Sequence, residues 1–199
     1  MQFRKELNMT EVKRLFDFPY YQLEKYPQDA ALVTKVNGDW VKTSTQEYID
    51  KANALSRGLV KLGVQPNDKI AIISMTNRTE WNICDIGILQ TGAQDVPIYP
   101  TISEEEYAYV LNHCEAKYCF VSCNEVLAKV EKIKEIVPSL IGVYSYDEIG
   151  SCDNWTEVLQ LGEDNPELQQ EVEQRMAAVH EDDLATLIYT SGTTGKPKG

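Results

Sequence analysis

The sequence predicts an α/β fold built on a largely parallel sheet flanked by helices. Short runs rich in Ile and Val alternate along the chain with longer segments whose apolar residues recur at helical spacing. The short runs are apolar almost throughout, which is typical of strands covered on both faces. Alternating strands and helices join through right-handed crossovers into a parallel sheet. We therefore expect residues 45–199 to form an α/β unit that an N-terminal helix and a β-hairpin precede.

The first 44 residues predict a helix and a hairpin. In residues 1–29 the apolar positions suit an amphipathic helix that proline residues interrupt and end. Residues 30–44 hold β-forming residues on both sides of Asn37 and Gly38, a pair that favours a tight hairpin turn. Trp40 lies in the second arm of that hairpin, and we expect it to pack into the core.

Five strands are expected after the hairpin, with helices between them. Several helices begin at a signal in which Ser or Asn is followed three positions later by Glu. In this capping box each side chain bonds to the other residue's backbone N–H, which satisfies donors that the first helical turn leaves free. The capping residues are Ser44, Asn77, Ser103 and Asn154. The expected strands are 69–74, 94–99, 118–122, 140–146 and 184–189.

The composition excludes several classes of protein. A net charge of −12 and a pI of about 4.6 leave no basic surface for a nucleic acid. A hydrophobic content of 43% with 25% charged residues is that of a soluble globular protein. No apolar run approaches the length of a membrane span, and the N-terminus lacks the core of a signal peptide. We therefore expect a cytoplasmic protein with no nucleic-acid partner.

The five cysteines favour neither disulfides nor a metal site. Their number is odd and their spacing irregular, which argues against a disulfide framework. A zinc site could be imagined from His113 and the three cysteines that follow it, but no paired Cys-x-x-Cys exists there. We expect the cysteines to be small buried side chains in a reducing compartment, and we expect no metal ligand in the chain.

The stretch 189–199 predicts a loop that binds phosphate. It follows an apolar run and combines hydroxyls, glycines and two lysines. Glycine lets backbone N–H groups approach a ligand, successive N–H groups in a turn form an anion-binding nest, and lysine adds positive charge. The candidate phosphate-binding residues are Thr190, Ser191, Gly192, Thr193, Thr194, Gly195, Lys196, Lys198 and Gly199.

The spacing of this loop differs from that of the Walker loop. Only two residues separate Gly192 from Gly195, and a proline follows Lys196. Because proline disfavours helix at the preceding residue, no helix is expected to begin directly under the phosphates. The alternative is an ordinary turn rich in Gly and Thr, which the density of phosphate-binding groups makes the weaker interpretation.

The same stretch closely resembles the signature loop of the adenylate-forming superfamily, which includes acyl-CoA synthetases, luciferases and the adenylation domains of peptide synthetases. The family pattern is an aromatic residue followed by Thr/Ser-Ser-Gly-Thr-Thr-Gly-x-Pro-Lys-Gly, and residues 189–199 match it throughout. Residues 77–81 resemble the Asn-x-x-Glu-Trp start of a family helix. Residues 92–101 are most similar to the long-chain fatty acyl-CoA synthetase branch.

The resemblance implies an AMP-forming ligase that uses ATP, Mg²⁺ and coenzyme A. A fatty acid carboxylate would attack the α-phosphate of ATP, and coenzyme A would then displace AMP from the acyl-adenylate. The nine loop residues would hold the ATP phosphates; Lys198 matches a fixed family position, whereas Lys196 falls where the family varies. Residues 1–199 would be the N-terminal part of the large domain, ending at the phosphate loop. We therefore expect no catalytic residue in this chain and no activity from it alone.

Two other functions stay open. One is an adenylation domain that loads a carrier-protein thiol, and the other is a nucleotide-binding module without catalysis. The expected partners are small molecules, namely ATP, a fatty acid and coenzyme A, while peripheral membrane contact, acyl chain length and oligomeric state stay open. Asp182 and Asp183 could suggest acid/base chemistry, but we expect them to form the polar edge of a strand.

Overall fold

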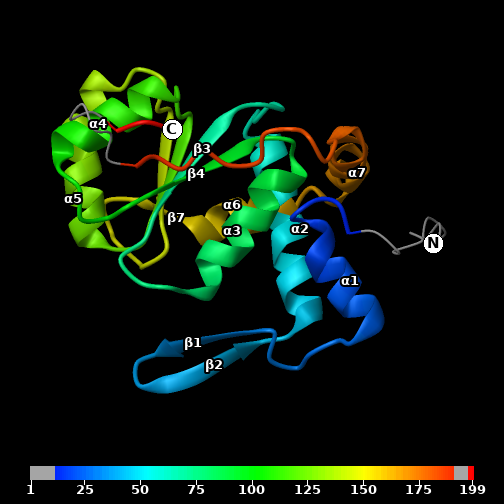
Figure 1. The fold of residues 1–199 in the computed structure, drawn as a ribbon. Helices are drawn as coiled ribbons and strands as arrows, with labels where there is room; N and C mark the ends of the chain where they lie inside the picture. The colour runs from blue at the N-terminus through cyan, green and yellow to red at the C-terminus, as the bar shows by residue number, and fades with distance from the viewer. Residues whose placement is uncertain (1–11, 191–196) are drawn as a thin grey trace.

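A parallel five-stranded sheet with helices on both faces forms the centre of the molecule (Figure 1). The computed structural model describes residues 12–190 and 197–199. The strand order is β4-β3-β5-β6-β7, and each neighbouring pair is parallel. The expected α/β fold is confirmed. The strands are β3 (Lys69–Ile73), β4 (Gln94–Ile98), β5 (Tyr118–Val121), β6 (Gly142–Ser145) and β7 (Asp153–Asn154).

Helices α2 to α6 divide between the two faces of the sheet, whereas α1 packs on α2, and α7 packs on α2 and α3 (Figure 1). One face packs on α4 and α5 through alternate residues of the strands, such as Ala71 and Ile73. The other face packs on α2, α3 and α6 through the intervening residues, such as Ile70 and Ile72. The helices are α1 (Asp17–Lys25), α2 (Thr45–Lys61), α3 (Thr79–Gln90), α4 (Glu104–His113), α5 (Asn124–Ile133), α6 (Trp155–Glu163) and α7 (Gln169–Ala178), with short 3-10 turns η1 (Lys134–Ile136) and η2 (Pro166–Leu168).

Helices α2 and α6 cross with their backbones in contact. A Cβ atom added to Gly162 would lie 1.8 Å from the carbonyl oxygen of Ala54, and one added to Gly58 would lie 2.0 Å from that of Val158. Such distances are far inside van der Waals contact, so only glycine fits at either position. This close crossing fixes α6 against α2 on the same face of the sheet.

Three of the four predicted capping boxes are confirmed, at Ser44, Ser103 and Asn154. The fourth prediction, at Asn77, is wrong: Arg78 precedes α3 and makes no capping bond with its side chain. The N–H of Thr79 instead donates to the Thr34 side chain at 2.9 Å. A residue distant in sequence thus satisfies a donor that a local cap was expected to satisfy.

The predicted hairpin is confirmed. It consists of β1 (Leu32–Val36) and β2 (Asp39–Thr43), joined by Asn37 and Gly38 with φ angles of 51° and 95°. Positive φ at both turn residues matches the twist of the strands. Trp40, however, was expected in the core and is 67% exposed. Alternate residues of a strand point to opposite faces, and Trp40 shares with its partner Lys35 the face opposite Thr34, which contacts α3.

The expected strand 184–189 is reduced to one parallel bridge between Thr186 and Asp95, at the free edge of β4. The N–H of Asp95 donates to the carbonyl of residue 185, and the N–H of Leu187 donates to Asp95. Two residues farther along β4 the same side of the ladder meets Pro97, which has no N–H to donate. The ladder therefore stops, and the fifth strand of the sheet is β7, in a region expected to be loop.

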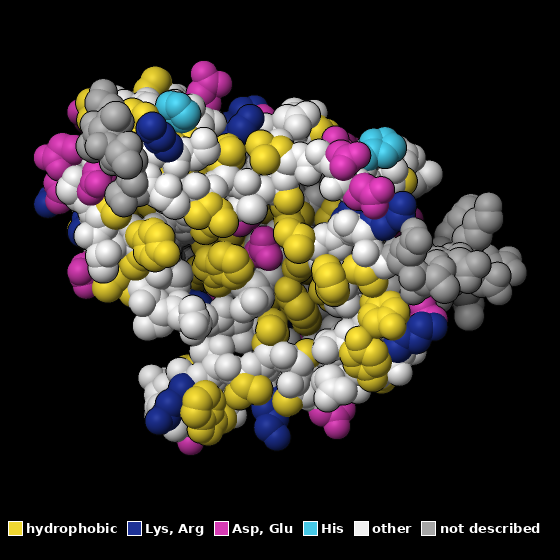
Figure 2. Space-filling model, in the orientation of Figure 1, with side chains coloured by type: hydrophobic (Ala, Val, Ile, Leu, Met, Phe, Trp, Pro, Cys, Tyr) yellow, Lys and Arg dark blue, Asp and Glu magenta, His cyan; other side chains and the backbone are white. Residues whose placement is uncertain are grey.

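Hydrophobic side chains gather in the middle of the face that the segment after α7 crosses (Figures 1 and 2). Leu184 and Ile188 of that segment are 54% and 57% exposed, and Tyr99 after β4 is 69% exposed. No helix in the described part of the chain is long and apolar enough to cross a membrane.

Candidate functional site

The base of the predicted phosphate loop is a two-bonded bridge. The N–H of Thr190 donates to the carbonyl of Lys198, and the N–H of Lys198 donates to the carbonyl of Thr190, both at 2.9 Å. The segment that leads to Thr190 runs parallel to β4, so the bridge follows the carboxyl end of that strand. Ligands of open α/β sheets bind beyond the carboxyl ends of the strands, and the base of this loop lies at that end of the sheet.

The described residues include three of the nine candidate phosphate-binding residues. Thr190, Lys198 and Gly199 are exposed beside one another at the bridge. The phosphate-binding roles of all nine stay predictions, and six of the nine lie outside the described residues: Ser191, Gly192, Thr193, Thr194, Gly195 and Lys196.

Tyr189 anchors the loop base in the core. Its side chain is 8% exposed and packs with the apolar cluster between the sheet and helices α4 and α5. Its hydroxyl lies 2.7 Å from Nδ1 of His113, and the two rings meet edge to face with centres 5.6 Å apart. Burial raises the pKa of Tyr189 to about 12, so the hydroxyl keeps its proton at neutral pH.

Gly199 completes this arrangement from the other end of the loop. A Cβ atom at Gly199 would lie 2.8 Å from carbon atoms of the Tyr189 ring. The chain can therefore pass over the ring only because this residue has no side chain. The signature pattern that residues 189–199 match also ends in glycine.

A cavity of about 330 Å³ adjoins the loop base. Its walls come from the carboxyl end of β4, from α4 and from both sides of the loop base. A volume of this size falls at the lower end of the range for small-molecule sites. The lining residues are Ile98, Tyr99, Ile102, Glu106, Val110, Tyr189, Thr190 and Pro197.

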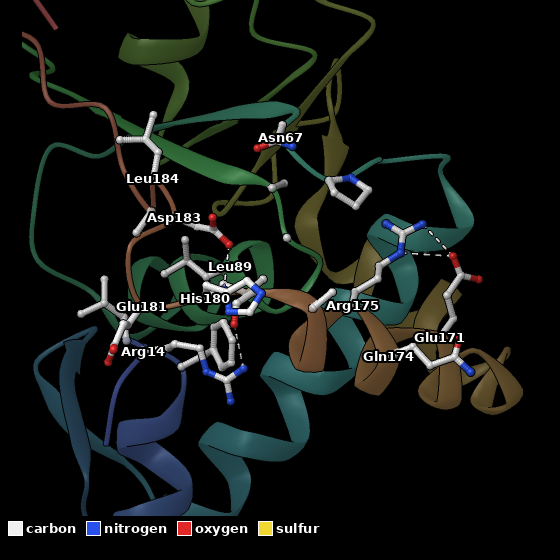
Figure 3. A pocket seen from close by; sticks show the side chains of 18 of the residues that line it. Arg14, Asn67, Leu89, Glu171, Gln174, Arg175, His180, Glu181, Asp183 and Leu184 are labelled. Carbon is white, nitrogen blue, oxygen red and sulfur yellow. Dashed lines mark hydrogen bonds and ion pairs between the residues drawn. The ribbon is translucent and has the colours of Figure 1, made fainter. Parts of the chain in front are cut away.

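A larger cavity of about 780 Å³ lies at the amino ends of β3 and β4, where it is lined by Asn67 and Ala93 (Figure 3). Its two arginines already have partners. Arg14 bonds to Asp17 and to two backbone carbonyls, and Arg175 bonds to Glu171. These partners satisfy the two arginines locally, and the predicted phosphate loop adjoins the smaller cavity instead.

The acidic pair before the edge segment and the cysteines, both considered as candidate residues from the sequence, have structural roles. The Asp183 carboxylate accepts a bond from the His180 N–H at 2.7 Å and closes a turn before the edge segment, rather than forming the edge of a full strand. Cys84, Cys114 and Cys119 are buried as expected, whereas Cys123 and Cys152 are only half-buried. Within residues 12–190 and 197–199, no three His, Cys, Asp or Glu side chains cluster as metal ligands would.

Sequence reasoning missed His113 as a partner of the loop. From the sequence, His113 was considered only as an imagined zinc ligand. Its contact with Tyr189 was missed because the two residues lie 76 positions apart. A contact at that separation carries no local pattern, and only the packing of α4 beside the edge segment brings the two residues together.

Comparison with known proteins gives the family. Residues 20–199 match the family model described as AMP-binding enzyme. The chain is 34% identical over 182 residues to long-chain-fatty-acid–CoA ligase ACSBG2 of Xenopus laevis, and 39% identical over 166 residues to long-chain-fatty-acid–CoA ligase FadD15 of Mycobacterium tuberculosis. These alignments cover 89% and 82% of this chain but 24% and 27% of the relatives, so the chain spans about a quarter of their length.

Solved structures show the same fold. The anthranilate CoA ligase AuaEII in complex with anthranoyl-AMP gives a TM-score of 0.70 at 21% identity, covering 92% of this chain and 32% of the ligase. The A-PCP didomain of carboxylic acid reductase from Segniliparus rugosus in complex with AMP gives 0.67 at 22% identity, covering 96% and 32%. At these identities the likeness shows the fold alone.

Proposed function

Because the chain belongs to the AMP-binding enzyme family, we propose that it is the N-terminal part of an AMP-forming long-chain fatty acid–CoA ligase. The observation that carries the proposal is the signature loop, whose described base stands at the carboxyl end of β4. The long-chain substrate rests on the two ligases at 34% and 39% identity. ATP, a fatty acid and coenzyme A are the proposed substrates of the whole protein.

The proposed reaction has two steps. A carboxylate oxygen of the fatty acid attacks the α-phosphorus of ATP, and the bond to the pyrophosphate oxygen breaks, which gives the acyl-adenylate. The sulfur of coenzyme A then attacks the acyl carbonyl carbon, the bond to the AMP oxygen breaks, and the thiol proton is released. The first step needs donors around the departing pyrophosphate, where negative charge develops.

The proposed role of the loop is to hold that pyrophosphate. The hydroxyls of Thr190, Ser191, Thr193 and Thr194, the N–H groups of Gly192 and Gly195, and the ammonium groups of Lys196 and Lys198 would donate to it. The backbone bridge between Thr190 and Lys198 supports this role, since it pairs these two exposed residues at the loop base. Donors held in place before the reaction cost no reorganisation when charge develops.

Other parts of the proposal concern the whole protein. Magnesium is expected with ATP, but the part of the chain that the structure describes offers no cluster of metal ligands, and we assign no step to the ion. The exposed apolar face around Leu184, Ile188 and Tyr99 suits cover by further chain, and the relative from Xenopus laevis is about four times longer than this chain. We propose a cytoplasmic enzyme, and we propose that these 199 residues alone do not turn over.

The test is ATP–pyrophosphate exchange by the full-length protein with acetate, octanoate, palmitate and a set of amino acids. Exchange with palmitate, followed by palmitoyl-CoA once coenzyme A is added, is the expected result. Exchange with an amino acid alone would assign the protein to the carrier-loading adenylation domains. Absence of exchange with every acid would leave a nucleotide-binding module and contradict the ligase proposal.

A further inference from the structure

Both ends of the phosphate loop are tied to one aromatic residue, Tyr189. The loop begins at Thr190, next to Tyr189, and ends at Gly199, which crosses the face of the Tyr189 ring. The bridge between Thr190 and Lys198 joins these two ends at the residue that follows Tyr189. Any displacement of the Tyr189 ring would therefore move the entry and the exit of the loop together.

The ring itself is held at its far end by α4. The Tyr189 hydroxyl and Nδ1 of His113 lie 2.7 Å apart, a normal hydrogen-bond distance. His113 is the last residue of α4, and its ring stacks on that of Tyr109, one helical turn earlier, at 5.6 Å and 28°. Because its own ring is oriented by Tyr109, His113 presents Nδ1 to the hydroxyl in a defined direction.

We propose that His113 is a positioning residue for the phosphate loop, acting through the Tyr189 hydroxyl. The inference rests on the proposed function and adds a residue to it. His113 holds Tyr189, Tyr189 supports both ends of the loop, and the loop holds the departing pyrophosphate. His113 touches none of the reacting atoms in this arrangement, so its effect is on the geometry of the loop and not on a chemical step of its own.

The expected consequence is confined to the first half-reaction. Pyrophosphate is released when the adenylate forms, whereas thioester formation from a finished adenylate does not involve it. Loss of the His113 bond should lower the turnover of ATP–pyrophosphate exchange about fivefold, as an ordinary hydrogen bond would give. The KM for the fatty acid and the rate of thioester formation from preformed palmitoyl-adenylate should stay within twofold of wild type.

The experiment uses the full-length protein and four variants. His113→Leu removes the bond and keeps a similar bulk, while His113→Asn keeps a side-chain amide near the position of Nδ1. Tyr189→Phe removes the same bond from the other side. His180→Leu is the matched control, because His180 is the other histidine of the chain and lies at the cavity on the amino ends of the strands.

The inference predicts a specific pattern. His113→Leu and Tyr189→Phe slow exchange alike, their combination is no slower than the worse single variant, and His113→Asn recovers to within twofold of wild type. If His113→Leu exchanged pyrophosphate at the wild-type rate, the inference would be overturned. It would also be overturned by equal slowing of both half-reactions, which indicates general damage to the fold, or by multiplied effects in the double variant, which indicate that the two side chains act independently.

Pyrophosphate binding, measured by calorimetry, separates this inference from the proposed function. If the wild-type protein binds pyrophosphate but exchanges with no acid, the ligase proposal fails. The positioning role then stands only if His113→Leu weakens that binding about fivefold and His180→Leu leaves it unchanged. Equal binding by wild type and His113→Leu, or no binding by either, would overturn the positioning role.

Discussion

Asp95 is buried at the free edge of the sheet, and its ionisation should weaken the fold. The side chain is 2% exposed, and its Oδ1 atom has no hydrogen-bond partner in the described structure. Burial raises the pKa of Asp95 from 3.8 to about 6, and the nearby Thr186 hydroxyl lowers it by less. Since the same residue forms the bridge that leads to the phosphate loop, the cost falls on a segment that matters for the proposed function.

The magnitude follows from the pKa. The rise from 3.8 to about 6 is about two pH units, and at about 1.4 kcal/mol for each it corresponds to about 3 kcal/mol. The folded-state pKa lies above the unfolded one, so the folded state binds the proton more tightly. The contribution of Asp95 to stability is therefore fully present below about pH 4 and is lost as the pH rises through about 6.

Asp95→Asn removes the charge and keeps the shape. In the full-length protein, we expect it to raise the free energy of unfolding at pH 8 by about 1 to 3 kcal/mol and to change it little at pH 4. Thermal unfolding at both pH values measures this, with the exposed Asp29→Asn as the control. Equal destabilisation by Asp95→Asn at both pH values would show that the carboxylate is not penalised by burial and would refute the reasoning.

Three further predictions concern packing, the loop and a second acid. Gly162→Ala should destabilise the protein by about 3 kcal/mol or more, because its Cβ would meet the Ala54 carbonyl oxygen at 1.8 Å. Urea denaturation would compare it with the control Gly150→Ala, whose Cβ would enter open space. Lys198→Ala should slow adenylate formation about tenfold or more and spare thioester formation, with Lys61→Ala as control; equal slowing of both steps would remove the phosphate role. Asp85→Asn should also stabilise more at pH 8 than at pH 5, since burial and then Asp95 raise the pKa of Asp85 to about 7; an effect independent of pH would contradict this.

Sequence reasoning succeeded where a few neighbouring residues determine the structure. Asn37 and Gly38 supply positive φ at both positions of a tight turn, which fixes the hairpin locally. The capping boxes at Ser44, Ser103 and Asn154 close within four residues, so their pattern is visible in the sequence. The alternation of apolar strands with helices then led to the correct fold class.

It failed where a distant partner decides. Trp40 has a large aromatic side chain of the kind usually found in a core, but the pairing of β1 with β2 turns it outward beside Lys35. The backbone N–H of Thr79, at the N-terminus of α3, donates to the side chain of Thr34 in the hairpin and not to that of Asn77. The strand expected at 184–189 depends on the edge of β4, where Pro97 ends the ladder. Each outcome depends on which residues meet in space, which a single sequence does not encode as a local pattern.

The candidate site also has one part that the sequence predicted and one part that it did not. The string 189–199 carries enough chemistry to predict a phosphate loop, and the structure adds the bridge at its base. The support beneath the loop, in which His113 holds Tyr189 and Gly199 covers its ring, could not be predicted from the sequence. It depends on α4 lying against the edge segment, and the residues involved have no common motif.

The most direct test of the account follows an oxygen atom. The full-length protein would be given palmitate labelled with ¹⁸O in its carboxylate, together with ATP, magnesium and coenzyme A, and the products would be analysed by mass spectrometry. If a carboxylate oxygen attacks the α-phosphorus, one ¹⁸O atom appears in the phosphate of AMP, and palmitoyl-CoA forms in equal amount. Label in inorganic phosphate, or AMP without label, would contradict an acyl-adenylate and with it the central claim.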